Sequence, residues 1–291
     1  MVNRLLGAPA DHSMMLFTVA ADGELEYAVG HTAVVDLSRH PVLWLGPARR
    51  DESFAELRRM ADGLRDPSQR ARLVEAVGVH DAAGVVPYLA AVLGRDGSNG
   101  VRKQAASGLG RHGTDEALEA LRTAVERDGS DDVRRQAVEA IGQTGTARSS
   151  AVLVRIAWTH PNPLLARQAA ESLGRLPAEW AAAPLDSIAR RHPDSRVAHQ
   201  AVESLGGYPD AVTGRYLRRI ARSHPNPRIS REAAEYLPGG GQADPDDDPD
   251  PQLDPGHDSD GDQLEIAIGD LEPALRGLSA LRDPANGGRT P

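Results

Sequence analysis

The chain has 291 residues and contains no cysteine, which excludes disulfide bonds and thiolate metal sites. Aromatic residues make up only 3% of the chain, and Ala, Leu and Val supply most of its apolar share, which favours close-packed helices over a sandwich of strands. The net charge of −9 is unevenly distributed: residues 239–291 hold 13 acidic and 3 basic residues, and the remaining 29 acidic and 30 basic residues leave the rest at +1. The body of the chain is therefore neutral and its C-terminal segment is acidic.

Residues 1–31 are predicted to form an N-terminal extension. Two apolar-rich runs, MMLFTVA and ELEYAVG, flank Asp22 and Gly23, a dipeptide that favours a tight turn, so we expect a β-hairpin from about residue 14 to 29. An isolated hairpin is marginally stable in water, and we expect this one to lean on the first helix that follows it. The first 13 residues contain too short an apolar run for a signal peptide, and we expect a cytoplasmic protein.

From about residue 32 onward, a pattern of apolar residues recurs every 32 residues. One part of each repeat contains a leucine, in the column Leu57, Leu89, Leu121, Leu153, Leu185 and Leu217. The second part resembles DDVRRQAVEAIG and closes at Gly78, Gly110, Gly142, Gly174, Gly206 and Pro238. Apolar spacings of i, i+3 and i+4 predict two helices per repeat, a first helix and a second helix. Residues 32–238 are therefore predicted to form an all-α solenoid of one half unit, VVDLSRHPVLWLG, and six full units.

Glycine, proline and capping residues mark the ends of the predicted helices. The glycine that closes each second helix is expected to end it by adopting a positive φ. In units four to six, the turn between the two helices begins with the histidines His160, His192 and His224. We expect partial positive charge on these histidines, near the C-terminus of the preceding helix. The residues expected to cap the following second helices are Asn162, Asp194 and Asn226.

The repeat resembles the HEAT repeat family, in particular bacterial repeats similar to those of phycobilisome lyases, whose second helix reads roughly D-x-x-x-V-R-x-x-A-x-x-A-L-G. Units two and three match best, through Asp96, Val101, Arg102, Ala105, Leu109 and Gly110, and through Asp128, Val133, Arg134, Ala137, Ile141 and Gly142. The resemblance implies a right-handed HEAT-like solenoid and a ladder between repeats made by these Asp and Arg residues. Units four to six have histidine in place of the Asp and no such Arg, so no ladder is expected there.

The sequence motifs indicate no catalytic site, cofactor or metal, and we expect none. Adjacent histidines of the column should lie roughly 8–10 Å apart, the packing distance of helices, and cannot share one ion. HEAT-repeat hydroxylases with an iron site carry His-Glu dipeptides, and no histidine of this chain is followed by Glu. The resemblance to phycobilisome lyases leaves a second interpretation open, an accessory lyase or protein-modifying enzyme that uses the concave groove.

The second helices of such solenoids usually line the concave surface, where we expect an unidentified protein or peptide to bind. A mostly basic column and a glutamine column mark this candidate face: Lys103, Arg135, Arg167, His199 and Arg231, and Gln104, Gln136, Gln168 and Gln200. Glutamates four residues after the basic column are expected to neutralise it along each helix, which argues against nucleic acid, as does the low aromatic content. We therefore predict a monomeric, non-catalytic scaffold for protein–protein interaction, without a membrane segment.

Beyond residue 238, Pro, Gly and Asp dominate the composition. Residues 239–263 are predicted to be a disordered acidic linker, and residues 284–291 a disordered end. Between them, residues 264–283 are predicted to form a short amphipathic helix, a candidate docking element with the leucines Leu271, Leu275, Leu278 and Leu281. Two interpretations of the acidic arm stay open: it occupies the basic face in competition with a partner, or it touches nothing and only solubilises the chain.

Overall fold

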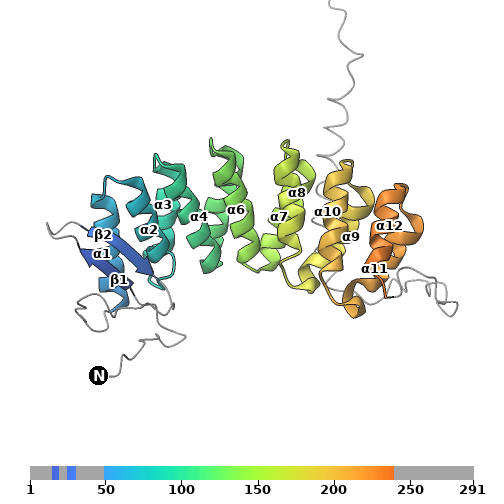
Figure 1. Cartoon of the computed structure of the whole chain (residues 1–291), viewed down its shortest axis with the longest axis horizontal. Coiled ribbons are helices and arrows are strands. Elements are labelled where there is room, and N and C mark those ends of the chain that lie inside the picture. Colours follow the sequence, from blue (N-terminus) through green and yellow to red (C-terminus); the bar gives the residue numbers. More distant parts are fainter. Residues whose placement is uncertain (1–14, 20–24, 31–48, 239–291) are drawn as a thin grey trace, which may run out of the picture. The chain divides into compact units, whose positions relative to one another are not determined.

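The computed structural model describes residues 15–19, 25–30 and 49–238, and within these residues the chain forms two short strands followed by twelve helices (Figure 1). Strands β1 (Met15–Val19) and β2 (Leu25–Gly30) pair antiparallel, with Phe17 opposite Ala28 and a shift in register between Thr18 and Val19. They are the strands expected on either side of Asp22 and Gly23. The turn between them, residues 20–24, lies outside the described residues.

The helices of the described residues form six pairs, which correspond to the six predicted units. The first helices are α1 (Arg50–Gly63), α3 (Val85–Arg95), α5 (Asp115–Arg127), α7 (Ala147–Thr159), α9 (Ala178–Arg191) and α11 (Asp210–Ser223). The second helices are α2 (Pro67–Val77), α4 (Asn99–His112), α6 (Asp131–Gln143), α8 (Pro163–Leu173), α10 (Ser195–Gly206) and α12 (Pro227–Glu235). Figure 1 shows the pairs side by side in chain order. Strand β2 packs against α2, and the helix expected directly after the hairpin lies outside the described residues.

Four predicted features lie outside the described residues: the half unit before α1, the acidic linker, the helix with Leu271, Leu275, Leu278 and Leu281, and the disordered end at residues 284–291. The solenoid itself is all-helical, as predicted. None of the helices in the described part of the chain is long and apolar enough to cross a membrane.

One continuous apolar core runs through the six pairs, because every helix buries one stripe of side chains. The leucine column of the first helices is at most 2% exposed in all six units, which confirms that it belongs to the core. In the second helices the stripe is narrower, and Ala105, Ala137 and Ala201 at its centre are 0% exposed. Fully burying one leucine contributes about 1.5–3 kcal/mol, so the regular spacing of the column spreads stability evenly along the stack.

The glycines at the ends of the second helices do not adopt the predicted conformation. Gly78 and Gly174 have φ angles of −62° and −64°, within the ordinary helical range. Among the described residues, positive φ angles occur at Gly113 and Gly145, which lie in the connections to the next unit. The prediction of a positive φ is therefore wrong for the whole column, Gly78, Gly110, Gly142, Gly174 and Gly206.

These glycines instead allow consecutive second helices to approach closely. A Cβ atom added to Gly110 of α4 would lie 2.8 Å from the backbone oxygen of Ala140 in α6. A Cβ atom on Gly142 of α6 would lie 3.0 Å from the Cβ atom of Ser172 in α8. Because both distances are shorter than an ordinary van der Waals contact, any side chain at these positions would push the helices apart.

The predicted caps of the last three second helices are confirmed. The side chain of Asn162 accepts a hydrogen bond from the backbone nitrogen of Leu164, and Asp194 and Asn226 cap α10 and α12 in the same way. Pro163 occupies the first turn of α8, where its missing N–H would have no helical partner. The turns of units four to six therefore fix where each second helix begins.

Candidate functional site

Pairs of guanidinium and carboxylate groups join the first three units. Nε of Arg70 in α2 donates to Oδ2 of Asp96 at 2.8 Å, and Nε of Arg102 in α4 donates to Oδ2 of Asp128 at 2.8 Å. Each arginine also donates to a backbone oxygen of the turn in its own unit, that of Leu64 or of Asp96, at 2.9 Å. Every rung of this ladder therefore ties the second helix of one unit to the turn of the next unit.

The rung between Arg102 and Asp128 is mostly shielded from water, with side chains that are 14% and 7% exposed. Burial raises the pKa of the Asp128 carboxyl, but the hydrogen bonds from Arg102 and from the backbone nitrogen of Ser130 outweigh it and leave this pKa below its ordinary value. The carboxylate thus stays ionised at neutral pH. A shielded ion pair of this kind holds neighbouring units in a fixed register.

The predicted ladder of units two and three is confirmed, and it begins one unit earlier than predicted. Unit one has Leu64 and Gln69 at the positions of Asp96 and Val101, so it matches the motif poorly. The signal that sequence reasoning missed is Arg70, which stands 32 residues before Arg102.

At the other end of the ladder is Arg134, whose Nε donates to the backbone oxygen of Asp128 at 2.6 Å and whose Nη1 lies 3.5 Å from Oδ1 of Asp131. The next turn offers it His160 in place of a carboxylate. The guanidinium–carboxylate ladder therefore stops before unit four in the described part of the chain, as expected.

Histidine rings connect the last three units instead. Nε2 of His192 lies 3.0 Å from the backbone oxygen of Ala157 in α7, and Nε2 of His224 lies 3.1 Å from that of Ala189 in α9. In His192 the other ring nitrogen, Nδ1, accepts from the backbone nitrogen of Asp194 at 3.1 Å. Both rings thus contact the backbone of the preceding unit through a ring nitrogen.

His160 is bound in the same manner, through backbone hydrogen bonds with Val125 and Asn162, and burial lowers its pKa below the ordinary value. For His160, this lowered pKa differs from the partial positive charge predicted for the column. The physical reason is that its ring is half-buried against a helix of the previous unit, where burial disfavours the charged form.

The candidate binding face lies on the second helices α4, α6, α8, α10 and α12, and its central units differ from its C-terminal units. In the C-terminal units its polar groups bind one another: Nε2 of Gln200 donates to Oε2 of Glu203 at 3.0 Å, and Nε2 of His199 lies 3.1 Å from Oε1 of Glu232. Burial raises the pKa of Glu232, whose Oε2 has no hydrogen-bond partner among the described residues. The exposed basic side chains are concentrated in the central units, apart from Arg231.

The predicted neutralisation of the basic column by glutamates on the same helix is wrong in α6 and α8. Nη1 of Arg175, in the connection after α8, donates to Oε1 of Glu139 at 2.9 Å, and its Nη2 donates to Oε1 of Glu171 at 2.9 Å. Arg135 pairs with Asp132 instead. The members of the column that form no ion pair with another described residue are Lys103, Arg167 and Arg231. These three positive charges are available to a partner.

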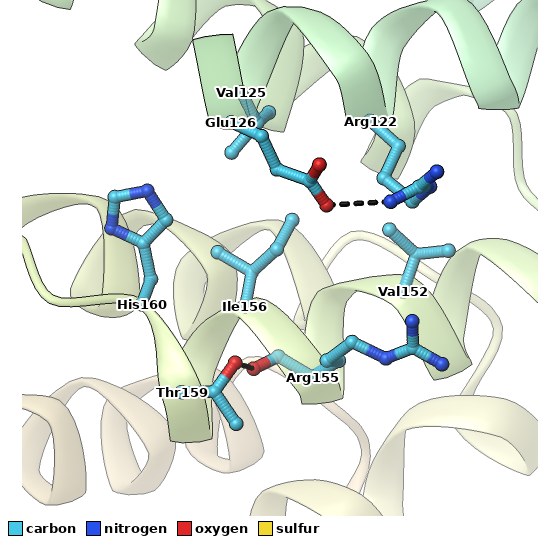
Figure 2. Close-up of a pocket in the computed structure, with 8 residues that line it drawn as sticks. All are labelled: Arg122, Val125, Glu126, Val152, Arg155, Ile156, Thr159 and His160. Carbon is cyan, nitrogen blue, oxygen red and sulfur yellow. Dashed lines mark hydrogen bonds and ion pairs between the residues drawn. The ribbon is translucent and has the colours of Figure 1, made fainter.

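A small pocket of about 70 Å³ lies between α5 and α7. Figure 2 shows its eight lining residues, Arg122, Val125, Glu126, Val152, Arg155, Ile156, Thr159 and His160. Nη1 of Arg122 donates to Oε1 of Glu126 at 2.6 Å, and Oγ1 of Thr159 donates to the backbone oxygen of Arg155 at 2.8 Å. Arg122, Glu126 and Thr159 are thus engaged within the lining, and the size of the pocket suits one aliphatic side chain.

A second and more open cavity of about 350 Å³ lies between the connection after α2 and the end of α4. His80 is held there by Oγ of Ser53 at 2.8 Å from its Nε2 and by the backbone oxygen of Ala76 at 2.9 Å from its Nδ1. Burial lowers the pKa of His112, which lines the same cavity. Across the described ranges, no three His, Asp or Glu side chains are grouped so that they could hold a metal ion.

The similarity of the chain to known proteins lies in its helical repeats. No curated protein matches the chain. Among solved structures, it is similar to the complex of CpcE and CpcF of phycocyanin lyase from Nostoc sp. PCC7120, with 21% identity, a TM-score of 0.39, and coverage of 54% of this chain and 99% of that chain. It is also similar to human deoxyhypusine hydroxylase in complex with glycerol, with 20% identity, a TM-score of 0.33, and coverage of 65% of this chain and 82% of that chain.

The sequence identities and TM-scores of these two structures are too low to support an argument about function. The family model for HEAT repeats matches residues 54–131 and 123–206. Together the matches span more than half of the chain and include the ladder, five of the six leucines of the column and most of the second helices. The chain therefore belongs to the HEAT repeat family.

Proposed function

We propose that the chain is a non-catalytic scaffold that binds a partner polypeptide on the face formed by its second helices. The observation that carries this proposal is the set of basic side chains that recurs in units two to six, because Glu139 and Glu171, which were expected to neutralise two of them, bind Arg175 instead. A partner that lies across several units would meet the same chemistry on each second helix.

The packing beneath this face favours binding without rearrangement. Arg135 and Arg167 stand on helices whose opposite sides are buried in the continuous core, and the rungs at Asp96 and Asp128 hold the first three units in register. A preorganised face loses little conformational entropy on binding, which lowers the cost of association. Each exposed charge contact contributes only about 0.2–1 kcal/mol, so useful affinity requires contacts on several units.

The side chains of this face support binding better than catalysis. Lys103, Arg135 and Arg167 are cations without a nearby nucleophile, and His199 is engaged with Glu232. The alternative, an accessory lyase or protein-modifying enzyme in the same groove, requires a reactive group or a bound prosthetic group at this face.

Affinity capture with the full chain tests the proposal. Proteins retained by the wild type should be identified by mass spectrometry, and their affinity measured for the variant Arg135→Glu/Arg167→Glu. The matched control is Arg58→Glu/Arg59→Glu, which changes the net charge equally on the exposed side of α1. We expect the α6 and α8 variant to lose the partner and the control to keep it. Equal retention by both variants, or a stoichiometric chromophore in the purified chain, would contradict a scaffold that binds through this face.

A further inference from the structure

The exposed side of α11 carries an unusual density of positive charge. Its arginines, Arg215, Arg218, Arg219 and Arg222, are spaced by three and four residues and therefore lie on one side of the helix. Leu217 and Ile220 point the other way and are at most 1% exposed. The single acidic residue of α11 is Asp210, whose Oδ1 is 3.9 Å from Nη1 of Arg218, at the limit of an ion pair.

A buried carboxylate on α9 holds part of this surface in place. Asp186 is only 3% exposed, and its Oδ2 accepts from Nη2 of Arg190 at 2.7 Å and from Nη2 of Arg219 at 2.8 Å. The guanidinium carbons of Arg215 and Arg219 lie 4.7 Å and 5.6 Å from the ring centre of Tyr216. One carboxylate thus serves two guanidinium groups, and the arginine side chains are oriented before any ligand arrives.

Helix α1 holds the same place in its unit as α11 does, so its charged residues can be compared with those of α11. In α1, five units earlier, Arg58 and Arg59 stand at the positions of Arg218 and Arg219 in α11. There, Arg58 lies 3.7 Å from Asp62, and Arg59 pairs with Glu56.

The corresponding positions of α11 hold no carboxylate, because Tyr216 replaces Glu56 and Arg222 replaces Asp62. The two arginines recur in the last unit without the carboxylates of Glu56 and Asp62; Arg219 pairs with Asp186 of α9 instead, and Arg218 lies 3.9 Å from Asp210. This surface therefore differs from its counterpart by charge and not by fold.

We propose that Arg215, Arg218 and Arg219, together with Val212, form a second docking surface, the α11 arginine face, which binds an acidic polypeptide segment. Guanidinium groups bind carboxylates through paired hydrogen bonds, as Asp186 already illustrates. Val212 is 42% exposed and stands three residues before Arg215 on the same side of the helix, so it can contact an apolar side chain among the acidic ones.

The same geometry disfavours nucleic acid as the ligand of this surface. Single-stranded nucleic acids are bound largely by stacking of bases on open aromatic rings. The aromatic ring of this surface, Tyr216, lies beneath the guanidinium groups of Arg215 and Arg219. The exposed Val212 likewise matches a polypeptide better than a phosphate backbone.

Fluorescence anisotropy with the full chain tests this proposal. The probe is a fluorescein-labelled synthetic peptide of Asp and Glu with two leucines, and an RNA oligonucleotide of equal charge is measured in parallel. The variant Arg215→Glu/Arg218→Glu leaves Arg219 and its bond to Asp186 intact, and circular dichroism verifies its fold. The control Arg58→Glu/Arg59→Glu imposes the same change of net charge on the equivalent region of α1.

At low ionic strength, we expect the α11 variant to weaken peptide binding by about tenfold or more and the α1 control by less than about twofold. The variant Arg135→Glu/Arg167→Glu should bind the peptide like the wild type, which separates this inference from the proposed function of the second-helix face. Equal losses in the α11 and α1 variants would overturn the proposal, since they indicate attraction to net charge alone. Absence of saturable peptide binding, or tighter binding of the RNA through the same arginines, would also overturn it.

Discussion

Replacing Gly110 by alanine should separate two second helices that pack in close contact. The added methyl group would lie 2.8 Å from the backbone oxygen and 3.0 Å from the Cα atom of Ala140. A flexible side chain could rotate away, but these are backbone atoms of α6. The methyl group therefore forces α4 and α6, neighbours in Figure 1, to move apart along their contact.

The magnitude follows from two opposing effects. Overpacking a well-packed core costs about 1–3 kcal/mol. Alanine inside a helix is favoured over glycine by up to about 1 kcal/mol, which offsets part of this cost. Gly94 provides a matched reference, because it lies in α3 and a Cβ atom there would meet nothing within 4 Å. Gly94→Ala should therefore stabilise the chain, and Gly110→Ala should be less stable than Gly94→Ala by about 1–3 kcal/mol.

Urea denaturation followed by the helical circular dichroism signal measures this difference. Repeat proteins can unfold unit by unit, so the variants are compared only where their transitions have the same dependence on urea. If Gly110→Ala proves as stable as Gly94→Ala, the close approach of the second helices does not explain the glycine column.

Replacing Arg102 by glutamine should lower the free energy of unfolding by about 1–3 kcal/mol in urea titrations, because it leaves the Asp128 carboxylate buried without its guanidinium partner; a loss no greater than that of the exposed Arg167→Gln would contradict this. Since burial lowers the pKa of His160, the folded state disfavours its protonation. The stability linked to His160 should thus be complete above pH 6.5 and fall as the pH drops through 6.5 toward the folded pKa, and His160→Gln should flatten part of that slope in thermal melts. Deleting residues 239–291 should raise the affinity for a partner at low salt if the acidic arm occupies the basic face; unchanged affinity would show that the arm touches nothing there.

The solenoid could be predicted from the sequence because apolar periodicity reports burial directly. A leucine that recurs at the same place in six units, such as Leu121, is predicted to lie in the core, and it does. The caps could be predicted for a similar reason, since Asn162 acts on the backbone only two residues away. The structural role of Gly110 could not be predicted, because glycine suits both a positive φ and a close contact between helices. Only the position of the neighbouring helix decides between the two.

Features that depend on contacts between units were the hardest to predict. The rule of i and i+4 pairs considers one helix at a time, and it assigned Glu139 and Glu171 to arginines of their own helices. Arg175 binds both from a connection that folds over them, which no local pattern indicates. The α11 arginine face was missed for the opposite reason. Its arginines are visible in the sequence, but the replacement of Glu56 and Asp62 by Tyr216 and Arg222 emerges only when α11 is compared with α1.

The two halves of the stack are joined by different chemistry, and this bears on how each presents its surfaces. Charged rungs such as Arg102 with Asp128 are shielded from water, so salt screens them little and acid breaks them only when the carboxylate is protonated. The ring of His160 instead accepts a hydrogen bond from the backbone nitrogen of Asn162, and burial lowers the pKa of this ring, so that protonation in acid opposes the contact. The contact that His160 makes between units three and four should thus weaken at a pH at which the Asp128 carboxylate is still ionised.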